Sequence, residues 1–342
     1  MVYISGNSIV SAFTSGVSVK KIFTNGVQVW PEETPPTPEY YIRWTPSDIS
    51  SGTFSIGDST YNFSDYSGYF TDFDGVITQS AFKSNSFIET IETNALSIDK
   101  GAFWSCSKLT SISLPSCDYI GGGAFTSCSL LSQLNLPECK YISAQAFYYC
   151  TSLSQVSLPV CSFIGNVAFC RCIFSKIDLP VCTYISDAAF VGCGFLEQVS
   201  LPVCSVLSDE AFQNCTSLKE VSLPACKRIG IHTFSGCYSL SQVSLPVCEK
   251  MSLYAFYSCY SLTEVNLPVC SSIGSWVFKN CSTLSILTLR YSSVCRCGAG
   301  ILEGTPIESG IGSIYVPASL VNAYKSADYW SIYSNQIYSI PQ

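Results

Sequence analysis

Cysteine is the residue type in this sequence with the most possible chemical roles, because thiols can form disulfides, bind metals or act as nucleophiles. Of the 20 cysteines, all but Cys170, Cys295 and Cys297 fall into two columns that recur about every 22 residues. The first column is Cys106, Cys128, Cys150, Cys172, Cys193, Cys215, Cys237, Cys259 and Cys281, and the second is Cys117, Cys139, Cys161, Cys182, Cys204, Cys226, Cys248 and Cys270.

A disulfide or metal framework is the functional interpretation of these columns. Neighbouring repeats would bring like cysteines within the Cα distance of a disulfide, but their Cβ vectors would be roughly parallel. Zinc requires four converging ligands, usually in Cys-x-x-Cys pairs, and the sequence contains no such pair. Since a buried thiol also serves as a small apolar group with a weak donor, we expect free structural thiols without disulfides, metal or cofactor.

Other catalytic chemistry has little support in the composition. His232 is the only histidine, and neither a phosphate-binding loop motif nor a His-Glu-x-x-His motif occurs. The net charge of −7 argues against nucleic acid as a partner. No apolar run predicts a transmembrane helix, and Lys20 and Lys21 follow the first apolar stretch instead of preceding it as in a secretory signal. We therefore expect a non-enzymatic protein that does not insert into a membrane.

The cysteines belong to an internal repeat. Leu-Pro recurs at residues 114, 136, 158, 179, 201, 223, 245 and 267, with Leu289 as a ninth member, and phenylalanine recurs in step from Phe103 to Phe278. The spacing is 22 residues except for one step of 21, which arises from a deletion between Cys172 and Leu179. We expect this deletion at a corner between elements, where changes in length are tolerated.

The segment from Leu109 to Leu130, LTSISLPSCDYIGGGAFTSCSL, represents one repeat. Ile112 and Leu114 alternate with polar residues, which predicts a short strand with one buried face, and proline ends that strand. The Ala-Phe-x-x-Cys part predicts a short helical turn. One unit cannot cover its own apolar face, so we expect the units to stack into a solenoid of about nine to ten coils with a parallel β ladder.

The motif L-x-x-[VIL]-x-L-P-x-C-x-x-I-[GS]-x-x-A-F-x-x-C resembles the BspA-like (Treponema pallidum type) leucine-rich repeat over about residues 100 to 290. This resemblance implies a leucine-rich-repeat solenoid in which short helical turns connect the strands. The C-terminal region resembles the closing segment of that family, with Ile314 to Pro317 in the strand-proline position. Leu320, Val321 and Tyr324 would then form one face of a final helix, followed by Trp330.

The first 80 residues differ from the repeat. Val17 to Trp30 contains two alternating runs around Asn25-Gly26, which predicts a β-hairpin. The segment KKIFTNGVQVW resembles N-terminal segments of structural and host-recognition proteins of gut-bacterial phages. We divide the chain into an N-terminal hairpin module for attachment (residues 1–30), a stiff proline-rich linker (31–39), a small β region that caps the first coil (40–80), the solenoid (81–313) and a C-terminal cap (314–342).

Two rows of outward-facing side chains are the candidate binding residues. The polar row includes Gln133, Asn135, Gln155 and Ser157, which could bind a glycan or a protein through many weak hydrogen bonds or simply keep a sheet face soluble. The aromatic row consists of Tyr119, Tyr141, Phe163 and Tyr184. These rings could stack on sugars or anchor a protein interface, or they could only pad the edge of the solenoid.

These features favour a phage virion structural protein, such as a fibre, tail or decoration subunit. Its N-terminal module would bind other virion proteins, and its solenoid would meet a glycan or protein on a bacterial surface. Such a protein is assembled in the host cytoplasm and needs no export signal. A BspA-like adhesin on the bacterial cell surface is the alternative, and homo-oligomer formation is left open. A glycan hydrolase would require paired carboxylates in a cleft, which the scattered acidic residues neither identify nor exclude.

Overall fold

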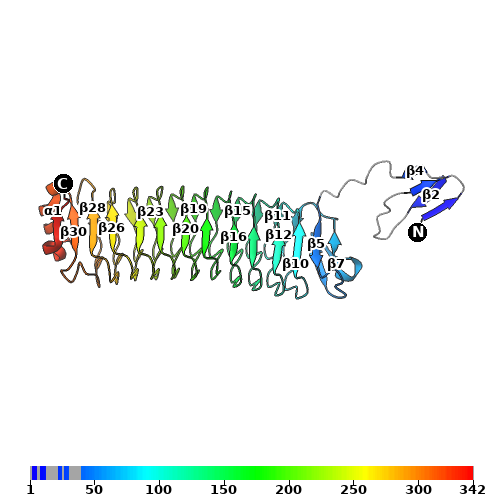
Figure 1. The fold of residues 1–342 in the computed structure, drawn as a ribbon, viewed down its shortest axis with the longest axis horizontal. Helices are drawn as coiled ribbons and strands as arrows, with labels where there is room; N and C mark the ends of the chain where they lie inside the picture. Colours follow the sequence, from blue (N-terminus) through cyan, green and yellow to red (C-terminus); the bar gives the residue numbers. More distant parts are fainter. Residues whose placement is uncertain (1, 6–7, 13–21, 25–26, 31–39, 342) are drawn as a thin grey trace.

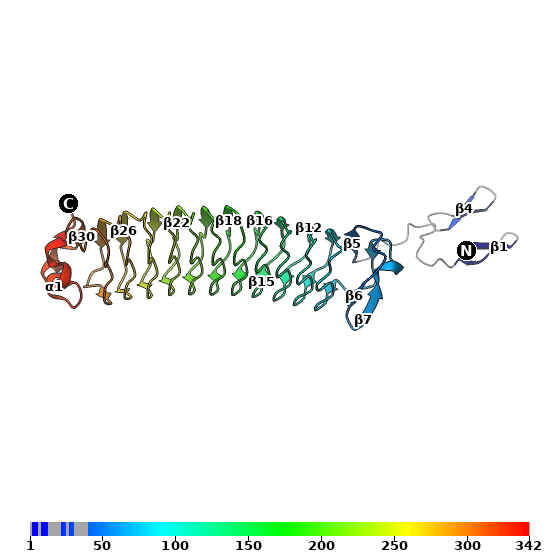
Figure 2. The ribbon, with the colours of Figure 1, turned by 90° about the horizontal axis from the view of Figure 1, so that it is seen from below.

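The computed structural model describes residues 2–5, 8–12, 22–24, 27–30 and 40–341. From residue 40 onward the chain winds into a long rod of stacked coils with a cap at each end (Figures 1 and 2). Within the described residues, no helix is long and apolar enough to cross a membrane.

A sheet of two-residue strands forms one long side of the rod, which we call the narrow face. Its 11 strands pair in parallel, each with the strand of the next coil. They are β9 (Val76–Ile77), β11 (Ser97–Ile98), β13 (Tyr119–Ile120), β15 (Tyr141–Ile142), β17 (Phe163–Ile164), β19 (Tyr184–Ile185), β21 (Val206–Leu207), β23 (Arg228–Ile229), β25 (Lys250–Met251), β27 (Ser272–Ile273) and β29 (Arg296–Cys297). Since β9 pairs with β11, this ladder begins before residue 81, where the sequence places the first coil.

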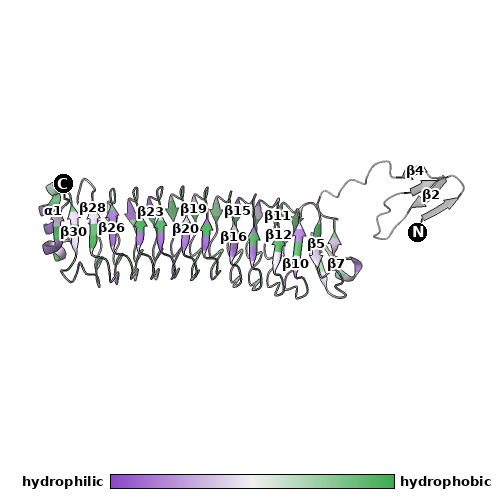
Figure 3. Cartoon of the chain, in the orientation of Figure 1, coloured by the Kyte–Doolittle hydropathy of each residue, from purple (hydrophilic) through white to green (hydrophobic). Residues whose placement is uncertain are grey.

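Slightly longer strands form the other sheet side of the rod, which we call the broad face. They are β10 (Thr90–Thr93), β12 (Ser111–Ser113), β14 (Gln133–Asn135), β16 (Gln155–Ser157), β18 (Lys176–Asp178), β20 (Gln198–Ser200), β22 (Glu220–Ser222), β24 (Gln242–Ser244), β26 (Glu264–Leu267), β28 (Ile286–Leu289), β30 (Ser313–Val316) and β31 (Ile337–Ser339). Along most of these strands, outward polar residues alternate with inward apolar residues (Figure 3). The strand pairing is parallel and is interrupted between β16 and β18 and between β24 and β26.

The predicted parallel solenoid is confirmed, and it is longer than the nine to ten coils expected. The broad face has 12 strands, one for each turn, so the rod makes about 12 turns. The first and last turns lack the Leu-Pro motif, so counting that motif misses them.

The third side of each coil is a run of hydrogen-bonded turns, so the predicted short helical turn is present as single turns and not as a continuous helix. Two residues per coil have left-handed backbone conformation, as at Gln145 (φ 60°) and Tyr149 (φ 59°), which flank Ala146-Phe147. Such residues prevent a continuous helix. Alternate amides bond three residues back, as from Tyr148 N to Gln145 O at 3.1 Å, and the amides between them bond to the next coil, as from Gln145 N to Asn166 O at 2.8 Å and from Phe147 N to Ala168 O at 2.8 Å.

A continuous stack of phenylalanine rings forms the centre of the core. The rings are nearly parallel, with neighbouring centroids 5.1–5.7 Å apart. The stack runs through Phe82, Phe103, Phe125, Phe147, Phe169, Phe190, Phe212, Phe234, Phe256 and Phe278, all of which are buried. Because each ring packs against the ring of the next coil, the coil spacing and the core packing are fixed together.

The single 21-residue step lies in the turn between Cys172 and β18, as the sequence predicts. Phe174 occupies the position that Leu153 holds in the preceding coil and is fully buried. Its ring meets Phe169 and Phe190 edge-on, with centroids 5.8 Å and 6.2 Å away. The broad-face pairing is interrupted next to this coil, between β16 and β18, and the burial of Phe174 keeps the core continuous.

A small antiparallel unit covers the N-terminal end of the rod. Its elements are β5 (Ile42–Thr45), β6 (Thr53–Ile56), β7 (Ser59–Asn62), the 3-10 helix η1 (Phe63–Asp65) and β8 (Tyr69–Phe70). β5 pairs antiparallel with β10, and Phe54 stacks on Phe82 with 5.3 Å between centroids. The reversed strand direction and the extra ring close the exposed end of the ladder and of the phenylalanine stack.

The C-terminal cap contains η2 (Ala318–Leu320), α1 (Val321–Ser326) and η3 (Ser331–Gln336). The predicted final helix is present, and its Tyr324 and the following Trp330 are buried. Trp330 Nε1 donates to the carbonyl of Cys295 at 2.7 Å, and Cys295 N donates to Tyr324 Oη at 2.8 Å. These two bonds attach the cap to the last coil.

The N-terminal segment contains two antiparallel strand pairs. β1 (Val2–Ser5) pairs with β2 (Ser8–Ala12), which the sequence did not predict, and β3 (Ile22–Thr24) pairs with β4 (Val27–Trp30) in the predicted hairpin. The Asn25-Gly26 turn and the linker at 31–39 lie outside the described residues.

Candidate ligand-binding face

The cysteine columns form hydrogen bonds inside the rod. Each thiol of the first column donates to the phenylalanine carbonyl of the preceding coil, as from Cys128 Sγ to Phe103 O at 3.0 Å. Each thiol of the second column donates to the carbonyl two residues ahead, as from Cys117 Sγ to Tyr119 O at 3.2 Å. All 20 cysteines are free thiols, and all except Cys297 are buried.

Burial makes these thiols poor nucleophiles. Desolvation raises the pKa of Cys117, Cys139 and Cys150 from the ordinary value of 9.0 to about 12. Within the part of the chain that the structure describes, no group of three or more His, Cys, Asp or Glu side chains could hold a metal ion. The columns thus act as core and hydrogen-bond donors to the backbone, so the candidate site must be sought on the surface.

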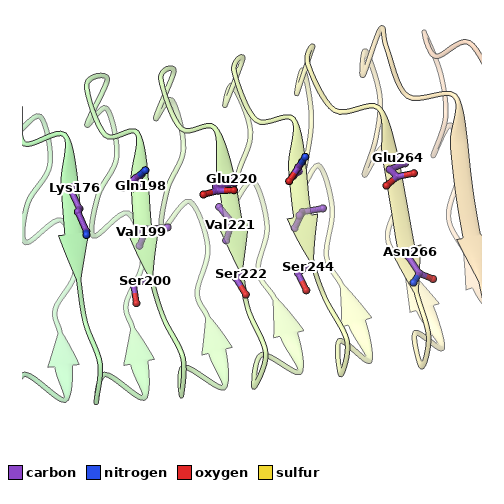
Figure 4. A pocket seen from close by; sticks show the side chains of 12 residues that line it. Lys176, Gln198, Val199, Ser200, Glu220, Val221, Ser222, Ser244, Glu264 and Asn266 are labelled. Atoms are coloured by element: carbon purple, nitrogen blue, oxygen red, sulfur yellow. The ribbon is translucent and has the colours of Figure 1, made fainter.

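A shallow groove on the broad face is the strongest candidate for a ligand site (Figure 4). It crosses five neighbouring strands, from β18 to β26. We call it the polar groove, and its lining residues are Lys176, Gln198, Val199, Ser200, Glu220, Val221, Ser222, Gln242, Val243, Ser244, Glu264 and Asn266.

Parallel pairing places like side chains of the polar groove in rows along the rod. One row contains Gln198, Glu220 and Gln242, which are paired residues in β20, β22 and β24. The other row consists of the serines of the same strands: Ser200, Ser222 and Ser244. Between the rows lie valines whose side chains form a mostly buried apolar floor.

The polar side chains of the groove have no internal partners. Within residues 40–341, the amide and hydroxyl groups of Gln198, Gln242, Ser200 and Ser244 make no hydrogen bond to another protein group, and all four residues are exposed. Other exposed hydroxyls nearby do bond within the chain, as Ser241 Oγ donates to Lys219 O at 3.2 Å. The groove therefore presents a regular set of unused donors and acceptors to a ligand.

The predicted polar residues lie on the same broad face, on the two strands that precede β18, where the polar groove begins. Gln133 and Asn135 on β14 pair with Gln155 and Ser157 on β16, and all four face outward. They line smaller hollows than the polar groove. The sequence places the side chains on the correct face, but it gives no sign that the larger hollow lies beyond the interruption at β18.

The predicted aromatic row lies on the narrow face, so the structure does not bring it together with the polar row. Tyr141, Phe163 and Tyr184 stack on one another, with centroids 5.3 Å and 5.7 Å apart. Tyr119 and Tyr184 each accept a hydrogen bond from a serine of the next coil, at 3.0 Å and 2.8 Å. Because stacking covers the ring faces between Tyr141, Phe163 and Tyr184, these facing surfaces are not free to stack against sugars.

One aromatic cluster was missed by the sequence reasoning. His232, Tyr254 and Trp276 stack at the turn side of three successive coils, with centroids 4.8 Å and 5.2 Å apart. They occupy the left-handed position immediately before each Thr-Phe, Ala-Phe or Val-Phe pair. The common position relative to the phenylalanine column is the signal that could have identified them.

The fold and its outward rows define a leucine-rich-repeat solenoid with a polar sheet face. The BspA type leucine rich repeat region matches residues 75–197, 118–225 and 205–327. The chain therefore belongs to the BspA-type leucine-rich repeat family.

Solved structures of bacterial proteins are similar. A leucine-rich repeat protein from Bacteroides ovatus ATCC 8483 is 25% identical, with a TM-score of 0.60, and the match covers 77% of this chain and 68% of that one. A leucine rich cell surface protein from Faecalibacterium prausnitzii A2-165 is 17% identical (TM-score 0.40; 83% and 89% covered). The pneumococcal vaccine antigen PcpA is 15% identical (TM-score 0.40; 85% and 88% covered). No curated protein gives a significant match.

Proposed function

We propose that this protein is a non-enzymatic binding protein that is displayed on a biological surface and holds its ligand on the broad face. The observation that supports this proposal most directly is the set of in-register polar side chains that have no hydrogen-bond partner within residues 40–341. A rod of similar stacked coils holds such a face rigid, because each coil packs against its neighbours.

The chemistry of the interior favours binding over catalysis. Burial raises the pKa of thiols such as Cys117, Cys139 and Cys150, and the acidic residues Glu220 and Glu264 stand in an open groove two coils apart. Neither arrangement provides an activated nucleophile or a carboxylate pair that encloses a bond. Fold does not determine function, so this part of the proposal needs a direct turnover assay.

The protein could be carried by a bacterial cell or by a phage particle. The family favours the bacterial cell surface, and the resemblance of the N-terminal segment to phage proteins favours the virion. The family match ends at residue 75 on its N-terminal side, and the strand pairs β1–β2 and β3–β4 lie outside it. We propose that residues 1–39 form the attachment module in either setting.

The test uses the full chain and a variant that lacks residues 1–39. Purified protein is incubated with bacterial cells, and bound protein and glycan products are measured. We expect adherence by both chains and no products. Expression in the native context should show the full chain on cells or phage particles and the shortened chain released. If the chain without residues 1–39 is still displayed on cells or particles, the attachment role of these residues is contradicted. If glycan products are formed, the non-enzymatic binding role is contradicted.

A further inference from the structure

We infer that the polar groove binds a neutral, linear glycan that runs along the rod with about one sugar per coil. This inference deepens the proposed function and rests on it. The polar groove has two polar borders and an apolar floor, and all three repeat at the spacing of the coils (Figure 4).

The repeat distance is the first argument. Neighbouring strands of a parallel sheet lie about 4.8 Å apart, which is close to the length that one sugar ring adds to an extended chain. A side chain such as Gln198 therefore recurs, at Gln242, in step with the hydroxyl groups of such a ligand. Because Glu220 stands between the two glutamines, a chain that keeps this register meets a serine at each of these coils and a glutamine at every second coil.

The cross-section of the polar groove is the second argument. An extended sugar chain has hydroxyls along two edges and C–H groups on its faces. The Gln and Glu row can bond one edge, the serine row can bond the other, and Val199 and Val243 can lie beneath the C–H face. Glutamine amides and serine hydroxyls both donate and accept, so they match hydroxyl groups in either role.

The residues of the polar groove disfavour other ligands. Protein interfaces concentrate their binding energy in Trp, Tyr and Arg, and none of these lines the groove. Lys176 carries the single positive charge against the carboxylates of Glu220 and Glu264. This excess of negative charge repels acidic glycans and nucleic acids, which leaves a neutral glycan as the ligand that fits best.

The test is a titration of the full chain with β-1,4-linked glucose oligomers, from the disaccharide to the octasaccharide. We expect affinity to rise with length until the oligomer spans the five strands from β18 to β26 and then to level off. Coiled α-1,4-linked glucose oligomers should bind much more weakly. Equal binding of both series, no dependence on length, or no binding would overturn the inference.

Single substitutions then locate the site. Gln198→Ala and Gln242→Ala should each weaken binding by about fivefold, the effect of one lost hydrogen bond. Gln213→Ala, on the turn side, is the matched control and should leave binding unchanged. An equal loss in the control would overturn the placement. If the chain adheres to cells but binds no oligosaccharide, the glycan inference fails while the proposed function stands; if it adheres to nothing, both fail.

Discussion

The Cys150 thiol donates a hydrogen bond to the carbonyl oxygen of Phe125 in the preceding coil, with 3.1 Å between Sγ and O. The same oxygen accepts a bond from the backbone amide of Cys128, also at 3.1 Å. One carbonyl thus receives a donor from its own coil and a donor from the next. This relationship, repeated along the first column, explains why a cysteine stands beside each phenylalanine of the stack.

Replacing Cys150 by alanine should lower the free energy of unfolding by about 1–2 kcal/mol, because the substitution removes one hydrogen bond and leaves a small cavity. Urea unfolding followed by circular dichroism measures the change. Cys297→Ala is the control, since Cys297 is only half-buried and its Sγ lies 3.9 Å from Asp328 O. The same loss in both variants would show that the bond to Phe125 contributes nothing.

The cysteine columns should make the protein sensitive to alkali. Burial raises the pKa of Cys139, Cys150 and Cys204 from 9.0 to about 12, so the folded chain holds these protons after the unfolded chain has lost them. The free energy of unfolding should therefore fall as pH rises from about 9 to 12 and be independent of these groups below pH 9. Urea midpoints measured across this range test the expectation, and a flat profile would contradict it.

The phenylalanine stack should be the most sensitive part of the core. Phe190→Ala removes a fully buried ring that contacts both neighbours, and we expect a loss of about 3–5 kcal/mol. Phe195→Ala serves as the control, because Phe195 is 65% exposed and should cost far less. Comparable losses in thermal unfolding would show that the stack does not dominate the core.

The aromatic row of the narrow face should contribute to stability more than to binding. Phe163→Ala breaks the stacking contacts with Tyr141 and Tyr184, and aromatic pairs add about 0.5–1.5 kcal/mol each. We expect lower stability and unchanged adherence to the ligand surface. Unchanged stability with lost adherence would instead favour the narrow face as the binding site.

The repeat could be predicted from the sequence because each coil carries the same inward residues. The Leu-Pro and phenylalanine columns fix the register, and the structure places Phe103 and Phe125 in the expected stack. The turn between coils was harder to predict, since Gln145 and Tyr149 adopt left-handed conformations that neither residue type favours. Hydrogen bonds between coils stabilise those conformations, and a single repeat does not contain such bonds.

The candidate site was predictable only in part. Alternation along the strands identified Gln133 and Gln155 as outward-facing. The depth of the hollows on the broad face, however, depends on how neighbouring coils pack. The sequence also does not show that Phe174, after the one-residue deletion, takes the buried position that Leu153 holds in the preceding coil. Stacking among Tyr141, Phe163 and Tyr184 depends on ring orientation, which the spacing of residues does not specify.

The central claim is that the polar groove holds the ligand, and blocking it tests that claim most directly. Ser200→Arg and Ser244→Arg together place long charged side chains in the groove, while Gln213→Arg places one on the turn side. Adherence of the purified full-length variants to bacterial cells is measured beside circular dichroism of each variant. The double variant should fold normally and lose adherence, and Gln213→Arg should retain it. Full adherence by a folded double variant would contradict the account.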